Sequence, residues 1–153
     1  MKVPMKHWEQ LTRDARRAFQ NHSYLHALEL NHSALLFSKR HFNGLFEKDA
    51  DRAIAAVLVS YFNAIDNHLA LYDFNKARSV FDNALRFLIV VHSKPQLSEQ
   101  QFTAILHGAS HLHSEWCRFL QTNEDEISEL NITGFQASID ALSDSRQVFT
   151  PLH

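Results

Sequence analysis

The sequence contains 153 residues, of which 45% are hydrophobic, and its formal net charge at pH 7 is −2. This length suits one domain that can bury its own core without disulfides or a structural metal. The pI near 6.6 gives no overall basic surface of the kind that binds nucleic acid, so we expect no nucleic-acid partner. Only three Gly and three Pro occur, and this scarcity favours helices over sheets, which need turn residues often.

The compartment is inferred from the cysteine content and from the hydropathy of the chain. The single cysteine, Cys117, excludes a disulfide within the chain and suits a reducing compartment. The first residues lack the apolar core of a signal peptide, and no apolar run reaches the ~18 residues of a membrane span. We therefore expect a cytoplasmic protein with no membrane partner. The eleven His residues are expected at surface or boundary positions.

In the first third of the chain, apolar residues recur every three or four positions, which predicts helices. The first predicted helix covers residues 6–20 and the second covers residues 24–42. Ser23 is expected to cap the start of the second helix by accepting from its first backbone amides. Asn43 and Gly44 are expected to end it, because both residues tolerate a positive φ angle.

The same periodicity predicts helices over residues 49–72 and 75–92. Asp49 and Asp51 suit the positive end of the helix dipole at the start of the first of these. Lys94 and Pro95 end the second, because proline disfavours a helical residue before it.

In the last third, Ser98 and Gln101 have the spacing of a capping box, which predicts a fifth helix to about residue 121. A short turn near 127–130 and a last helix over about 133–148 follow. The sequence thus predicts an all-α protein of about six helices with short loops.

Two segments resemble tetratricopeptide repeats. Each has small residues where two antiparallel helices approach one another and an aromatic residue beside the turn that joins them. In the first segment the matching residues are Leu11, Ala15, Ala18, Tyr24, Ala27 and Ala34. In the second they are Tyr61, Ala64, Ile65, Phe74, Ala77, Phe81 and Ala84.

The two copies lie fifty residues apart, judged from Ala27 and Ala77, whereas the family repeats about every 34 residues. The helices between them are therefore longer than usual or joined by an insertion, which resembles the degenerate repeats of some bacterial regulators. The resemblance implies a single domain, a short right-handed solenoid of antiparallel helix pairs. The pairs cover about 6–42 and 49–92, with a degenerate third pair over about 98–148. The alternative is a plain helical bundle.

The resemblance also implies a concave groove, formed by the first helix of each pair, that binds a peptide or helix of another protein. Self-association as a homodimer is a close variant. By register, the groove would include Arg13, Arg16, Phe19, Phe62, Asn63 and Asp66. Asn63 falls where carboxylate-binding members of the family place an Asn, but Thr12 and Arg16 stand where such a clamp has Lys and Asn.

The rival hypothesis is a metal-binding helical enzyme or sensor. His107, His111 and Glu115 follow one another at steps of four residues, so they share one helix face and carry side chains that coordinate zinc. A metal site normally takes at least one ligand from another element, and exposed His and Glu side chains explain the same pattern.

Cys117 is the one thiol, and we expect it to be a small buried hydrophobic residue. A nucleophilic cysteine needs a base nearby, and His113 is the only local candidate. The sequence contains no G-x-S-x-G, P-loop or H-E-x-x-H motif. We therefore expect a binding module rather than an enzyme, with no cofactor.

Overall fold

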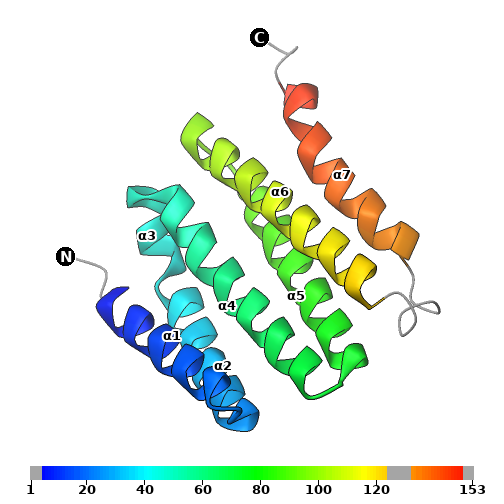
Figure 1. Ribbon diagram of the computed structural model, residues 1–153. Helices are drawn as coiled ribbons and strands as arrows, with labels where there is room; N and C mark the ends of the chain where they lie inside the picture. The colour runs from blue at the N-terminus through cyan, green and yellow to red at the C-terminus, as the bar shows by residue number, and fades with distance from the viewer. Residues whose placement is uncertain (1–4, 124–131, 150–153) are drawn as a thin grey trace. The chain divides into compact units, whose positions relative to one another are not determined.

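The computed structural model describes residues 5–123 and 132–149, and the regular secondary structure within these residues is entirely helical (Figure 1). The helices are α1 (Met5–Gln20), α2 (Tyr24–Arg40), α3 (Phe42–Lys48), α4 (Ala50–Ala70), α5 (Phe74–His92), α6 (Glu99–Thr122) and α7 (Ile132–Phe149). The all-α prediction is confirmed, with seven helices in the described residues instead of about six. The predicted turn at 127–130 lies outside those residues.

The chain divides after Phe81, within α5, into two compact units. In the first unit, α1 packs against α2, and α2 and α3 both pack against α4 (Figure 1). Small side chains line the contact between the first two helices: Ala15, Ala27 and Ala34 are at most 1% exposed. These alanines allow the two helix axes to approach closely, as the sequence predicts.

The α1–α2 turn closes α1 with two backbone hydrogen bonds. The amide of Ser23 donates to the Ala18 carbonyl at 2.8 Å, and the amide of His22 donates to the Phe19 carbonyl at 3.0 Å. This is a Schellman motif, with His22 in the left-handed conformation at φ 61°. The expectation that Ser23 caps α2 is wrong, because its backbone (φ −90°, ψ 67°) is not the extended form that aims the hydroxyl at the next amides.

The predicted stop at Asn43 and Gly44 is also wrong. The second helix ends at Arg40, and after His41 the chain continues as the short helix α3, with Gly44 inside it and not at positive φ. Burial explains this helix, because Phe42 and Phe46 are at most 5% exposed and their rings stack with centroids 4.9 Å apart. The inserted helix accounts for part of the fifty-residue spacing between the two repeat-like segments.

In the second unit, α6 packs against α7. The predicted capping box is confirmed: the Gln101 amide donates to Ser98 Oγ at 3.1 Å, and the Ser98 amide donates to Gln101 Oε1 at 2.9 Å. The fully buried Trp116 ring lies 4.2 Å from the Phe135 ring, centroid to centroid, which joins the two helices. These contacts make α6 and α7 two packed helices.

Candidate functional site

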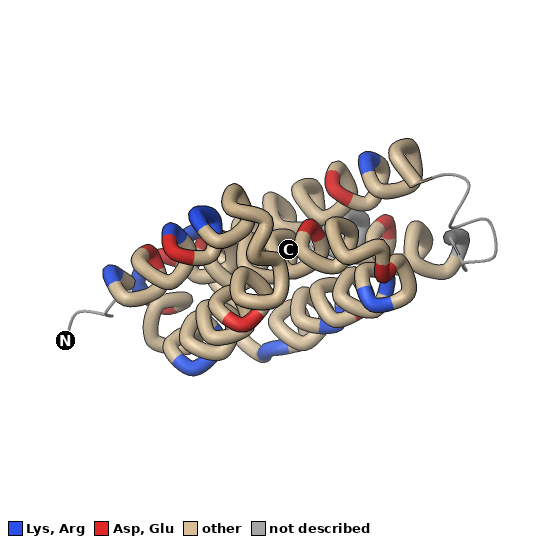
Figure 2. The backbone as a smooth tube through the Cα atoms, turned by 60° about the horizontal axis from the view of Figure 1, so that its bottom comes forward, with Lys and Arg blue, Asp and Glu red and all other residues tan. Residues whose placement is uncertain are grey.

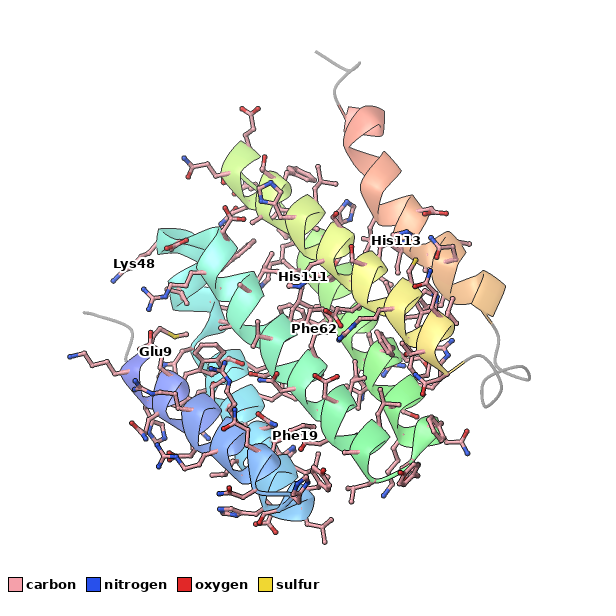
Figure 3. The ribbon with its side chains drawn as sticks, in the orientation of Figure 1. Glu9, Phe19, Lys48, Phe62, His111 and His113 are labelled. Atoms are coloured by element: carbon pink, nitrogen blue, oxygen red, sulfur yellow. The ribbon has the colours of Figure 1, made fainter. Side chains whose placement is uncertain are left out.

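A cavity of about 70 Å³ lies between α1, α2 and α4 of the first unit. Four of the six residues predicted for the groove line it: Arg16 and Phe19 from α1, and Asn63 and Asp66 from α4. Figure 3 shows Phe19 in the C-terminal half of α1, between that helix and α4. The remaining lining residues are Ala15, Asn31 and Asn67.

The other two predicted groove residues, Arg13 and Phe62, do not line this cavity. The exposed Arg13 side chain donates to Gln10 Oε1 at 3.4 Å on the outside of α1. Phe62 is only 7% exposed and belongs to the core, because it is turned about 100° around α4 from the neighbouring Asn63. Of the six residues predicted for the groove, four line the cavity, Arg13 faces solvent and Phe62 belongs to the core.

Asn31 and Asn67 are cavity residues that the sequence analysis missed. They are 3% and 1% exposed, and the Oδ1 atom of each has no hydrogen-bond partner among the described residues. Asn67 Nδ2 donates to the Asn63 carbonyl at 2.8 Å, which leaves its Oδ1 as a free acceptor. A signal for Asn31 is present in the sequence, since it lies four residues after Ala27 and three before Ala34, within the packing stripe of α2.

The cavity departs from a carboxylate clamp at two positions. Thr12, at one clamp position, is only 8% exposed, and its hydroxyl donates to the Trp8 carbonyl at 2.7 Å inside α1. Arg16, at the other clamp position, lines the cavity together with Asn63, where such a clamp has an Asn in place of the arginine.

Two contacts hold α1 and α4 in register beside the cavity. Trp8 Nε1 donates to Ser60 Oγ at 2.9 Å, and Ser60 Oγ donates in turn to the Ala56 carbonyl at 2.9 Å. In the same N-terminal part of α1, Arg52 Nη2 lies 3.2 Å from Glu9 Oε1 as an exposed ion pair. The buried hydrogen bond is the more important of the two, because exposed ion pairs contribute little to stability.

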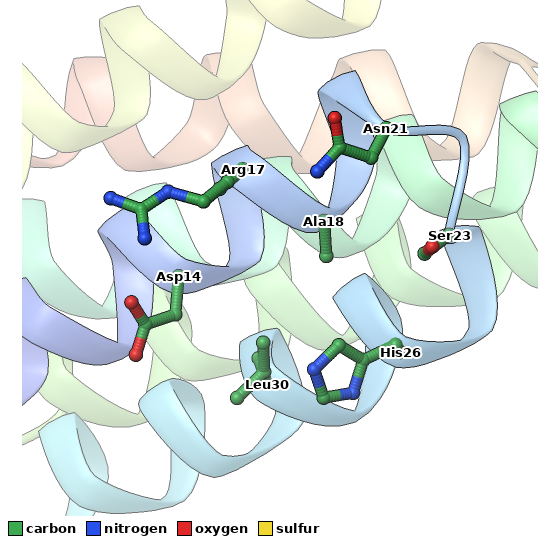
Figure 4. Close-up of a pocket in the computed structure, with 7 residues that line it drawn as sticks. All are labelled: Asp14, Arg17, Ala18, Asn21, Ser23, His26 and Leu30. Carbon is green, nitrogen blue, oxygen red and sulfur yellow. The ribbon is translucent and has the colours of Figure 1, made fainter.

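A second, larger depression of about 320 Å³ lies along α1, the α1–α2 turn and α2 (Figure 4). Its polar lining includes Asp14, Arg17 and His26, and Ala18 and Leu30 supply an apolar part. Asp14 already accepts from Gln10 Nε2 at 2.9 Å. This depression is open and mixed in charge, and no unpartnered buried polar atom among the described residues belongs to it. It is therefore the weaker of the two candidates.

The predicted metal ligands are not gathered into a site. All three lie on α6, where His107 and His111 are exposed and the Glu115 carboxylate pairs with the Arg118 guanidinium. No group of three or more His, Cys, Asp or Glu residues within the described ranges could hold a metal ion. A closed coordination shell requires a ligand from a second element, and the described residues supply none beside these three.

Cys117 is half-buried rather than buried, which corrects the sequence-based expectation. Its Sγ lies 3.5 Å from Nε2 of His113. Figure 3 shows His113 on the side of α6 that faces α7. Gln136 Nε2 lies 2.9 Å from His113 Nδ1 and also donates to Asp140 Oδ1 at 3.1 Å. With Gln136 as donor, His113 carries its proton on Nε2 and donates toward the sulfur, whereas a general base must accept from the thiol.

Acidic and basic positions occur together on the described helices, including the helix that follows the N-terminus (Figure 2). The basic residues Arg13, Arg16 and Arg17 share α1 with Glu9 and Asp14. This interleaving gives no continuous basic surface on α1. Within the described residues, no helix has the length and hydropathy that a bilayer crossing requires.

The chain belongs to the family described as "Protein of unknown function (DUF2753)", which matches residues 6–148. That match covers every described helix except the first residue of α1 and the last of α7. No curated protein and no solved structure matches the chain.

Proposed function

We propose that this protein is a cytoplasmic interaction module that binds a peptide segment or helix of another protein on the α1–α4 face of its first unit. The observation that supports this proposal is the cavity between α1, α2 and α4, which is lined by Arg16 and Phe19 from α1 and by Asn63 and Asp66 from α4. A side chain of another protein can therefore meet an aromatic ring, a guanidinium, a carboxamide and a carboxylate at one place.

The residues around the cavity suit a peptide ligand. Phe19 offers an aromatic surface that is only partly buried, and Arg16 offers an exposed guanidinium. Aromatic residues and Arg are the side chains that contribute most to protein interfaces. In the proposal, the two helical hairpins are tetratricopeptide-like pairs, and their first helices, α1 and α4, present the binding face.

The test is a comparison of two charge reversals at neighbouring positions of α1. Arg16 lines the cavity, whereas Arg17 is equally exposed and lines the larger depression instead. The tagged full chain and its Arg16→Glu and Arg17→Glu variants are used as bait in extracts of the native host, and captured proteins are identified by mass spectrometry. Candidates are then purified and their binding is measured by calorimetry.

The expected result is a partner that binds the parent chain and the Arg17→Glu variant but is lost with Arg16→Glu. All three proteins should remain folded, with Arg17→Glu melting slightly lower because it puts a negative charge in the last turn of α1. Equal capture by both variants would show that binding occurs elsewhere and would overturn the proposal for this face.

Self-association is a second candidate, supported by two exposed leucines on α2. Leu25 and Leu36 are 68% and 51% exposed, and their spacing of three helical turns places them on one side of the helix. Sedimentation equilibrium of the parent chain and a Leu25→Glu/Leu36→Glu variant tests this reading. A dimer that dissociates in the variant supports it, and a parent chain that stays monomeric at high concentration rules it out.

A further inference from the structure

We propose that two copies of this chain dimerise through the outer face of α2, with the two helices antiparallel about a two-fold axis. This proposal rests on the second candidate function, self-association, and adds to it the paired residues and the orientation of the helices. Leu25 of each copy packs against Leu36 of the other copy. Glu29 of each copy binds His32 of the other copy. The basis is the placement of these four residues along one exposed stripe of α2.

The stripe runs along the side of α2 that the first unit leaves exposed. The helix packs against α1, α3 and α4, and its other side is buried, with Ala27 and Ala34 at most 1% exposed. The four stripe residues are all exposed, and at 100° per residue they lie within about 60° of one another around the helix axis. They follow at steps of four, three and four residues, so that two leucines flank one carboxylate and one imidazole.

The stripe is complementary to itself under a two-fold rotation. Leu25 and Leu36 lie five and a half residues on either side of the point midway between residues 30 and 31. Glu29 and His32 lie one and a half residues on either side of the same point. A two-fold axis through this point, perpendicular to α2, therefore brings each leucine level with the other leucine of the second copy, and each carboxylate level with an imidazole. A two-fold contact forms every such pair twice.

The polar pair selects a second copy of the chain as the partner. Within the described residues, neither Glu29 nor His32 makes a hydrogen bond or an ion pair, although they lie only three residues apart on one helix. The imidazole donates an N–H to a carboxylate in its neutral and in its protonated form. A face of leucines alone would accept any apolar surface, whereas an acceptor and a donor at symmetric positions between the leucines complement the same face of another copy.

The dimer leaves the proposed peptide-binding cavity open. Asn31, which lines that cavity, lies about 130° around α2 from the middle of the stripe. The two functions therefore use different sides of α2. The dimer contact covers about three helical turns on each copy, which is small for a stable interface, so we expect a dissociation constant on the order of ten micromolar.

The first test is a double-mutant cycle on the polar pair, measured by sedimentation equilibrium of the full chain. Glu29→His places two imidazoles opposite each other, and His32→Glu places two carboxylates opposite each other. The double variant Glu29→His/His32→Glu exchanges the groups and restores both pairs. Each single substitution should weaken dimerisation about tenfold or more, and the exchange should return the dissociation constant to within about threefold of the parent value.

The matched control is His26→Glu, which makes the same change at an exposed position of α2 about 90° from the middle of the stripe. This variant should dimerise like the parent chain. Circular dichroism of every variant checks that a loss of the dimer is not a loss of folding.

Disulfide crosslinking tests the antiparallel orientation. The background is Cys117→Ser, which removes the one native thiol. A mixture of Leu25→Cys and Leu36→Cys proteins should form covalent dimers under mild oxidation, and either protein alone should do so far more slowly. The reason is that antiparallel packing separates the two copies of one position by about 16 Å along the helix axis, whereas a disulfide spans at most ~7 Å between Cα atoms.

A parent chain that stays monomeric at high concentration overturns both this proposal and self-association. Three results overturn this proposal alone and move the dimer contact to another face: a dimer that His32→Glu leaves unchanged, an exchange variant that does not recover, and equal crosslinking of the mixture and of the single proteins. None of these measurements needs a peptide partner, so their failure can be told apart from a failure of the Arg16→Glu capture experiment.

Discussion

His22 and Tyr72 occupy the same position in two turns that lie fifty residues apart, and both adopt the left-handed conformation, at φ 61° and 58°. Around Tyr72 the hydrogen bonds of the first turn recur: the Asp73 amide donates to the His68 carbonyl at 2.8 Å, and the Tyr72 amide donates to the Leu69 carbonyl at 3.0 Å. The α1–α2 and α4–α5 connections are therefore two copies of one local structure. The offset equals the one that relates Ala27 to Ala77.

Replacing Tyr72 by glycine should stabilise the protein by about 1 kcal/mol. A non-glycine residue in the left-handed region pays a steric cost that glycine avoids, and Tyr72 is 83% exposed, so little contact is lost. Urea unfolding measures the change. The control is Leu71→Gly at the preceding residue, which has φ −89° and should lose stability instead. A destabilised Tyr72→Gly protein would contradict the assignment of strain to this position.

The Asn31→Leu substitution should raise the melting temperature, with a gain in stability of about 1 kcal/mol. Its Oδ1 is buried without a partner, and removing an unsatisfied polar group in favour of an apolar one of similar size removes the desolvation cost. Asn67→Leu is the comparison, with a smaller gain expected because it also removes the 2.8 Å bond from Nδ2 to the Asn63 carbonyl. The melting temperatures of both variants, measured by thermal unfolding, show which substitution gives the larger gain in stability.

The stability of the protein should fall at mildly acidic pH, in part because of His68. Burial lowers the pKa of His68 from its ordinary value of 6.5; the nearby Asp73 carboxylate acts in the opposite direction, and Lys76 adds to the lowering. The unfolded chain therefore takes up this proton at a higher pH than the folded chain. The stabilisation from neutral His68 is complete above about pH 6.5 and is lost as the pH falls through and below that value.

The measurement is the melting temperature of the parent and of His68→Gln at about pH 8 and about pH 5. The parent should lose more stability over this interval than the variant, because glutamine has no proton to gain. Equal losses in the two proteins would assign the pH dependence to other groups.

Removal of the Ser60 hydroxyl should destabilise the protein by about 1 kcal/mol, because Ser60 Oγ accepts from Trp8 Nε1 at 2.9 Å and is itself buried. Ser60→Ala should also shift the fluorescence of Trp8, whose indole loses its partner. Ser79→Ala is the matched control, since the exposed Ser79 hydroxyl donates only to the Asn75 carbonyl of its own helix, at 3.1 Å. Similar effects of the two changes would argue against the role of the Trp8–Ser60 bond.

Helix type and most helix limits could be predicted because they depend on local signals. The capping box at Ser98 and Gln101 and the acidic start at Asp49, whose Oδ1 accepts from the Arg52 amide at 3.2 Å, act within one turn of the chain. Two predictions failed, the helix stop at Gly44 and the cap at Ser23, because residue type alone does not decide either feature. Gly44 was expected to stop a helix, but burial of Phe42 and Phe46 against α4 extends helical structure through it.

The contrast between Ser23 and Asp73 shows the second kind of failure. They hold equivalent places in the two turns, yet Asp73 Oδ1 accepts from the Lys76 amide at 3.2 Å while the Ser23 side chain makes no cap bond. Residue type predicts capping at both places equally. Because the two turns share their backbone hydrogen bonds, the longer reach of the Asp side chain is the difference that residue type supplies.

The sequence by itself determined the helical class, the fifty-residue repetition and the presence of Arg16, Phe19, Asn63 and Asp66 on two helices, because each follows from periodicity along the chain. Only the tertiary structure decided that these four meet Asn31 and Asn67 around one cavity, and that two carboxamide oxygens there have no partner among the described residues. Hydrogen-bond satisfaction depends on which side chains of α1, α2 and α4 come within about 3 Å of one another, and periodicity within a single helix carries no information about that distance.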